Sequence, residues 1–207
     1  MFYLPHTPAW LRALFPKGCV WQMPATTRAV YLTFDDGPHA EATPYVLEQL
    51  ERYSAKASFF CIGKNVVAHP ELYTAVLEQG HTVGNHTMHH LNGAKVSATE
   101  YVANYNLARQ HIHADIFRPP YGRISKAQAT GICALNPNAK IVMWSVLSGD
   151  FDQNITGERC FQHIKKHTKS GSIVVFHDSA KALPRLRVAL PKTLEWLQDQ
   201  GYKLAAL

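Results

Sequence analysis

Short β-rich runs alternate with amphipathic stretches of helical length from residue 29 to the end of the chain. This order favours parallel strands covered by helices, because parallel neighbours need long crossover connections. We predict seven strands, in residues 29–34, 57–62, 82–85, 116–118, 140–145, 172–176 and 202–205. Helices are expected between them, with capping boxes at Ser97 and Glu100 and at Ser125 and Gln128, and with Thr43 as N-cap before Pro44.

Polar residues stand at or just beyond the ends of five different predicted strands: Asp35, His86, Arg118, Trp144 and His177. A doubly wound sheet fits the alternation of elements as well as a barrel does. In a parallel β/α barrel, however, the carboxyl ends of all strands converge on one mouth. We therefore predict an α/β fold, a deformed (β/α) barrel of about seven strands.

No linker, internal repeat or low-complexity tract divides the 207 residues. We predict one domain in residues 27–207, preceded by a lead-in of residues 1–26 that packs on the barrel. Contact of the aromatic lead-in with a membrane surface is the alternative. Charged residues interrupt every apolar run, so no transmembrane segment is expected.

The net charge of +6 permits anionic partners without identifying one. The basic residues at helical spacing lack interleaved aromatic residues, which favours solvated helix faces over nucleic-acid binding. These residues are Lys165, Lys166, Lys169, Arg185, Arg187 and Lys192.

Two features bear on the cellular compartment. The four cysteines show no C-x-x-C spacing, and Cys61 and Cys133 lie in apolar segments, which favours buried free thiols and a reducing compartment. The first residues lack the basic start and the cleavage site of a secretory signal. We predict a cytoplasmic protein, with association with the cell envelope as the alternative.

The sharpest local pattern is Thr33-Phe-Asp-Asp-Gly-Pro38, two adjacent carboxylates where an apolar strand ends. Neighbouring side chains on an extended chain point in opposite directions. If the backbone bends here, Asp36 could ligate a metal while Asp35 acts as a base. An aspartate that caps local turn amides is the alternative.

Two histidine pairs have the spacing of four residues at which imidazoles on one helical turn can chelate a metal. His86 and His90 follow a predicted strand end. His163 and His167 lie in a lysine-rich helical stretch without a nearby carboxylate, so we interpret them as surface residues. Short motifs of this kind also arise by chance.

Two further segments carry candidate residues. In Phe117-Arg-Pro-Pro-Tyr-Gly122, prolines fix a turn that places the Arg118 guanidinium at a strand end and orients the Tyr121 amide. A structural turn with a surface arginine is the alternative. His177 directly follows a strongly apolar strand, where a satisfied core histidine is the usual explanation.

Taken together, these segments resemble the motifs of the polysaccharide deacetylases of the NodB-homology group, carbohydrate esterase family four. The resemblance extends over residues 33 to 178 in the order of the family's motifs. It implies a divalent metal, most often Zn²⁺ with Co²⁺ or Ni²⁺ as alternatives, held by Asp36, His86 and His90.

The resemblance also implies catalytic roles. Asp35 would be the base, Arg118 would hold it, the Tyr121 N–H would stabilise the oxyanion, and His177 would be the acid. The remaining residues expected at the substrate are Pro120, Trp144, Asp150 and Phe151, with buried packing as the alternative for Trp144 and Phe151.

The fourth motif, Trp144-Ser-Val-Leu-Ser-Gly-Asp-Phe151, departs from the family pattern. Leu147 replaces an aspartate expected to pair with the acid histidine, and Phe151 replaces a tryptophan. We therefore expect His177 to lose stabilisation of its charged form, which lowers its pKa, unless Asp150 or Asp178 substitutes.

The function implied is metal-dependent removal of N-acetyl groups from a glycan containing N-acetylglucosamine, with release of acetate. The expected partner is thus an acetylated glycan that is peptidoglycan-like or chitin-like. Hydrolysis of O-acetyl esters or small amides on the same site is one alternative. A catalytically inactive carbohydrate-binding relative is the other.

Overall fold

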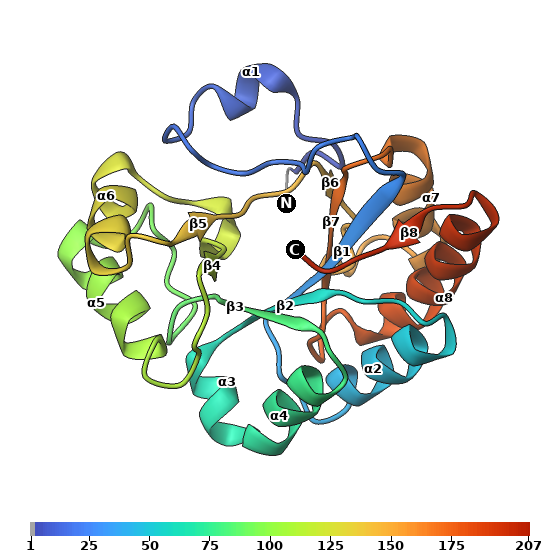
Figure 1. Cartoon of the computed structure of the whole chain (residues 1–207), viewed down its shortest axis with the longest axis horizontal. Coiled ribbons are helices and arrows are strands. Elements are labelled where there is room, and N and C mark those ends of the chain that lie inside the picture. The colour runs from blue at the N-terminus through green and yellow to red at the C-terminus, as the bar shows by residue number, and fades with distance from the viewer. Residues whose placement is uncertain (1–2) are drawn as a thin grey trace.

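The structure is a computed structural model that describes residues 3–207. Seven parallel strands form a curled sheet in the order β5-β4-β3-β2-β1-β7-β6, and β8 pairs with the beginning of β1. Figure 1 shows the helices arranged around the outside of the strands. The strands are β1 (Ala29–Asp35), β2 (Ser58–Cys61), β3 (Thr82–Asn85), β4 (Ile116–Phe117), β5 (Lys140–Ile141), β6 (Val146–Leu147), β7 (Ile173–His177) and β8 (Lys203–Leu204).

The helices occupy the intervals between strands, and the predicted deformed barrel is confirmed. The predicted capping box is complete at Ser125 and Gln128, whereas at Ser97 only one half is present, the bond from the Glu100 amide to the Ser97 side chain. The helices are α1 (Ala9–Arg12), α2 (Ala42–Arg52), α3 (Gly63–Ala68), α4 (Pro70–Glu78), α5 (Ala98–Ala108), α6 (Lys126–Leu135), α7 (Gly157–His167) and α8 (Leu183–Asp199), with a 3₁₀ turn η1 (Pro120–Gly122).

Alternation along the central strand β1 separates the core from the site. Leu32 and Phe34 belong to the main apolar cluster, together with residues of α2, α7 and α8. Thr33 and Asp35 therefore point to the other side of the sheet, the inside of the curl. The strand thus packs against the helices with one face and carries polar side chains into the barrel with the other.

Residues 3–26 of the predicted lead-in lie across the gap between the two edge strands, and residues 1–2 fall outside the described residues. Val20 pairs with Val142 just after β5, and His6 pairs with Val146 in β6. In Figure 1 this segment, drawn in blue, passes beside β5 and β6. The lead-in therefore supplies backbone partners to both open edges.

Two predicted boundaries are wrong. The strand expected at 140–145 ends at Ile141, and a separate strand, β6, follows at Val146. The interruption has a physical cause, because the carbonyls of Val142 and Met143 accept hydrogen bonds from the Arg118 guanidinium. Thr43 is also not the N-cap of α2, which begins at Ala42, and its buried hydroxyl has other partners.

The cysteines are only partly as predicted. All four are free, and Cys61 is buried, but Cys133 on α6 is exposed. Among residues 3–207, no helix combines the length and apolar character that a membrane crossing requires.

Candidate active site

The two adjacent carboxylates both belong to the site because the chain bends between them. Asp35 is the last residue of β1 and points into the barrel by strand alternation. Asp36 has a φ of 81°, a left-handed conformation that breaks the alternation. Its carboxylate then faces His86 and His90. The bend on which the sequence interpretation depended is present.

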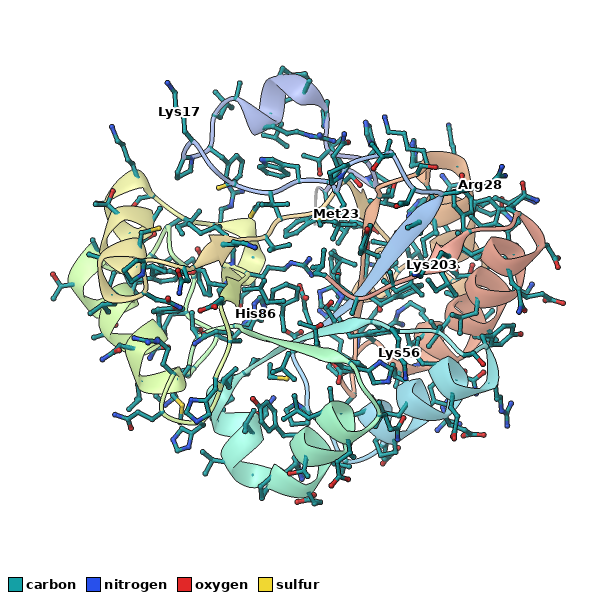
Figure 2. The ribbon with its side chains drawn as sticks, in the orientation of Figure 1. Lys17, Met23, Arg28, Lys56, His86 and Lys203 are labelled. Atoms are coloured by element: carbon teal, nitrogen blue, oxygen red, sulfur yellow. The ribbon has the colours of Figure 1, made fainter. Side chains whose placement is uncertain are left out.

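The histidine pair follows the neighbouring strand β3. His86 and His90 lie in a loop rather than on the expected helical turn, and Thr87 and His90 have positive φ angles of 63° and 56°. The two imidazole rings are nevertheless 5.0 Å apart between centroids. Figure 2 shows His86 among the central strands, whereas Lys17 of the lead-in points outward.

The tautomer of His86 is fixed by its surroundings. Its Nδ1 donates to the Arg118 carbonyl oxygen at 2.7 Å, which leaves the lone pair on Nε2. Burial lowers the pKa of His86 to about 4, although the carboxylates of Asp35 and Asp36 oppose this. The imidazole is therefore neutral near pH 7, the form that ligates metals.

The residues Asp36, His86 and His90 fit a divalent metal. Asp36 Oδ1 lies 3.1 Å from His90 Nε2 and 3.7 Å from His86 Nε2. Ligand atoms around tetrahedral zinc are roughly 3.3 to 3.6 Å apart. The same Asp36 oxygen is buried without a well-formed hydrogen bond, so a polar atom that needs a partner faces both imidazoles. Among residues 3–207, only these three form such a group of three or more candidate ligands.

The electrostatics at Asp36 favour its ionised form. Burial opposes ionisation, but the imidazoles of His90 and His177 lower the pKa of Asp36 well below its ordinary value. A carboxylate is the form that binds a cation.

Arg118 holds the other carboxylate. Its Nη1 donates to Asp35 Oδ1 at 2.6 Å and to the Thr33 hydroxyl at 2.7 Å. The guanidinium is fully buried and stacks 4.0 Å above the Phe60 ring, so it is not the surface arginine of the alternative interpretation. Asp35 is thereby fixed in position beside the candidate metal ligands.

His177 does not lack a carboxylate partner, because Asp150, one of the two substitutes that the sequence left open, takes the place of the missing aspartate. His177 Nδ1 donates to Asp150 Oδ1 at 2.7 Å, and the His177 backbone N–H donates to Asp150 Oδ2 at 2.8 Å. Burial disfavours the imidazolium, but Asp150 outweighs burial and raises the pKa of His177 to about 9. The lowering of this pKa that we expected without a substitute therefore does not occur.

Asp150 replaces the missing partner because of its place in the loop. Leu147 is a buried strand residue of β6, whereas Asp150 lies three residues later and is fully buried. With both carboxylate oxygens bonded to His177, we assign Asp150 to that histidine rather than to substrate. Arg185, interpreted from sequence as part of a solvated face, donates to the Asp150 carbonyl oxygen at 2.6 Å.

The residues expected to contact the oxyanion or the substrate differ in how far they are exposed to solvent. Tyr121 has a φ of 58° and is 53% exposed, and its ring lies 4.6 Å from that of His90. Phe151 packs edge-on against His177 at 5.3 Å, and half-buried Trp144 lies 5.9 Å from the Arg118 guanidinium. Pro120 is buried. Tyr121 is thus the most accessible of these residues.

Sequence reasoning missed several supports of the Asp36 loop. Asn65 donates to the Asp36 carbonyl oxygen at 2.7 Å, and the buried Asp178 accepts from the Gly37 amide at 3.1 Å. The sequence indicates Asp178 only as a possible partner of His177. Its position immediately after a strand end was the one signal in the sequence for a larger role.

Comparison with known proteins identifies the family of the chain. A family model described as polysaccharide deacetylase matches residues 22–135. A peptidoglycan-N-acetylglucosamine deacetylase of Bacillus cereus is 36% identical over 204 residues, which covers 95% of this chain and 94% of the relative. A chitooligosaccharide deacetylase of Azorhizobium caulinodans is 33% identical over 205 residues, covering 86% and 92%.

A solved structure gives the same result. The crystal structure of the peptidoglycan N-acetylglucosamine deacetylase Bc1960, bound to a naphthalenyl-N-oxidanyl-benzamide, superposes with a TM-score of 0.84 at 29% identity. The match covers 96% of this chain and 94% of that one. This chain belongs to the polysaccharide deacetylase family, as the resemblance of its motifs predicted.

Proposed function

We propose that the protein is a metal-dependent hydrolase that removes N-acetyl groups from polysaccharides or oligosaccharides containing N-acetylglucosamine and releases acetate. The substrate class is supported by relatives named as peptidoglycan-N-acetylglucosamine and chitooligosaccharide deacetylases. The metal dependence rests on one observation: Asp36 Oδ1 is buried without a well-formed hydrogen bond and faces two imidazole nitrogens at 3.1 and 3.7 Å.

The metal we propose is Zn²⁺, with Co²⁺ or Ni²⁺ as alternatives, because two imidazoles and one carboxylate are ligands that suit these ions. Asp36, His86 and His90 would supply three ligands and leave a position open. When bound, the ion supplies a Lewis acid that polarises the amide carbonyl and activates a water molecule.

The chain's own residues would then move the protons. Asp35, fixed by Arg118, accepts a proton from the water that adds to the acetyl carbon. As the C–N bond breaks, the imidazolium of His177 donates its Nε2 proton to the departing sugar nitrogen, because Nδ1 is held by Asp150. By the resemblance, the Tyr121 N–H stabilises the oxyanion. The products are acetate and a free amine.

The test is acetate release from a panel of N-acetylated glucosamine oligomers, O-acetylated glycans and small amides, each with and without a chelator. The proposal predicts that N-acetylated oligomers are the best substrates and that the chelator stops the reaction. Preference for O-acetyl esters or small amides would replace the substrate class and keep the metal site. No acetate from any substrate after addition of zinc would favour an inactive carbohydrate-binding relative.

A further inference from the structure

A chain of buried polar groups stands directly behind the Asp36 loop. The Thr43 hydroxyl accepts from the His39 amide at 2.8 Å and donates to Asp178 Oδ2 at 2.6 Å. The second oxygen of Asp178 accepts from the Gly37 amide at 3.1 Å. Thr43 and Asp178 are 0% and 1% exposed. One carboxylate therefore joins the loop after β1 to α2 and to the end of β7.

Gly37 is shaped for this contact. A Cβ at this position would lie 2.0 Å from Asp178 Oδ2, far inside contact distance. The carboxylate thus occupies the space that the missing side chain leaves. On the other side of the loop, the Ile62 amide donates to the Gly37 carbonyl oxygen at 2.9 Å. Gly37, the residue that follows Asp36, is consequently held at both its N–H and its carbonyl oxygen.

Asp36 needs such support because of its conformation. A non-glycine residue with a φ of 81° is strained and persists only where its surroundings determine it. Burial raises the pKa of Asp178 to about 8, so a carboxyl group is unfavourable here unless it is well bonded, and an apolar residue would suit a purely structural position. The arrangement has the form of a group that orients a metal ligand from behind.

We infer that Asp178, backed by Thr43, is a positioning residue that holds the Asp36 carboxylate in the geometry for metal binding. This inference rests on the proposed function, since it assumes that Asp36, His86 and His90 bind the ion. Asp178 contacts the loop and not the ion or the substrate, so its removal should weaken metal binding while the ligands stay in place.

The principal test is the zinc affinity of Asp178→Asn, measured at equilibrium by competition with a chromophoric chelator. The amide would direct an N–H at the Thr43 hydroxyl, which already accepts from His39, and would leave the hydroxyl proton without its acceptor. We expect the zinc Kd to rise about 10-fold to 100-fold, as for other groups that support metal ligands. At saturating zinc, the KM for the glycan should be unchanged.

Ile164→Ala is the control for a merely structural role. Ile164 is a fully buried core residue on α7, and its truncation destabilises the fold through a cavity. This variant should lower the melting temperature without changing the zinc Kd. If Asp178→Asn behaves in the same way, with wild-type zinc affinity, the inference is overturned.

Thr43 supplies a second pair of variants in case Asp178→Asn does not fold. Thr43→Val removes the hydroxyl at nearly constant shape and should raise the zinc Kd several-fold. Thr43→Ser keeps the hydroxyl, so its zinc Kd should stay close to the wild-type value. Equal zinc affinity in these two variants would contradict the inference. His86→Ala, measured alongside, separates a failure of the proposed metal site from a failure of the role of Asp178. If this variant also retains wild-type zinc affinity, the proposed metal site itself is wrong.

Discussion

The two histidine pairs have the same spacing but very different surroundings. His86 and His90 follow β3 in a loop, where both rings face the Asp36 carboxylate. His163 and His167 lie on α7, where His163 Nδ1 donates to the Ser148 carbonyl oxygen at 3.0 Å and His167 stacks on His6 at 5.5 Å. Both α7 residues are half-buried rather than fully exposed. The spacing of four alone therefore does not distinguish candidate metal ligands from histidines on a helix, whereas the carboxylate that a strand end brings to the first pair does.

The largest expected difference is in metal binding. His86→Ala removes a ligand and should abolish retention of zinc, whereas the matched variant His163→Ala should retain one zinc per chain. Elemental analysis of both proteins after gel filtration checks this. Equal zinc content in the two variants would erase the functional distinction between the pairs.

A second prediction concerns the carboxylate beside the first pair. Asp35→Asn removes the proposed base while Arg118 and the metal ligands remain. We expect the rate of acetate release to fall on the order of 10² to 10⁴-fold, with zinc content unchanged. Steady-state kinetics and elemental analysis on the same preparation test both parts. An Asn variant with full activity would show that another group accepts the proton.

The third prediction concerns pH, because the pKa of His86 in the first pair is lowered whereas the pKa of His177 across the site is raised. Asp150 raises the pKa of His177 to about 9, so the proton donor stays charged until the pH rises through that value. The rate should therefore fall on the alkaline side near pH 9. In Asp150→Asn the pKa should move down toward the ordinary value of 6.5, and the alkaline limb should move with it.

The ion pair between His177 and Asp150 also makes the stability of the fold depend on pH. Because the folded-state pKa of His177 is raised, its contribution is complete below about pH 6.5 and is lost as the pH rises to about 9. The free energy of unfolding should fall over this interval in the wild type and less so in Asp150→Asn. Identical pH dependence of rate and unfolding in the two proteins would remove the assigned role of Asp150.

The smallest effect is expected at the α7 pair. His163→Gln loses a half-buried hydrogen bond to Ser148, which contributes about 0.5 to 1.5 kcal/mol to stability. Chemical denaturation should show a decrease of that size, with acetate release unchanged at saturating substrate. A large loss of activity without loss of stability would mean that α7 participates in the reaction.

The sequence was sufficient for the fold class and for the main members of the site. Alternating strands and helices predicted a parallel α/β fold, and the polar residues at strand ends favoured a barrel over a doubly wound sheet and predicted which side chains meet. Asp35 and Arg118 illustrate this, since they come from β1 and from the residue after β4 and are joined at 2.6 Å. The parallel arrangement alone accounts for their convergence.

Details that depend on loop conformation were predictable only in part. The sequence left Asp150 and Asp178 open as partners of His177, and the turn after β6 decides between them by bringing Asp150 to the imidazole. The break between β5 and β6 depends on carbonyls bonded to a guanidinium 24 and 25 residues earlier in the chain. Cytoplasmic localisation and the identity of the metal stay predictions.

The most direct measurement is a titration of chelator-treated protein with Zn²⁺, with acetate release from an N-acetylglucosamine oligomer as the readout. If Asp36, His86 and His90 bind the single ion that the reaction needs, activity should be absent at first and rise linearly to a break at one equivalent of zinc per chain. Full activity before any zinc is added, with no metal detectable in the protein, would contradict the account.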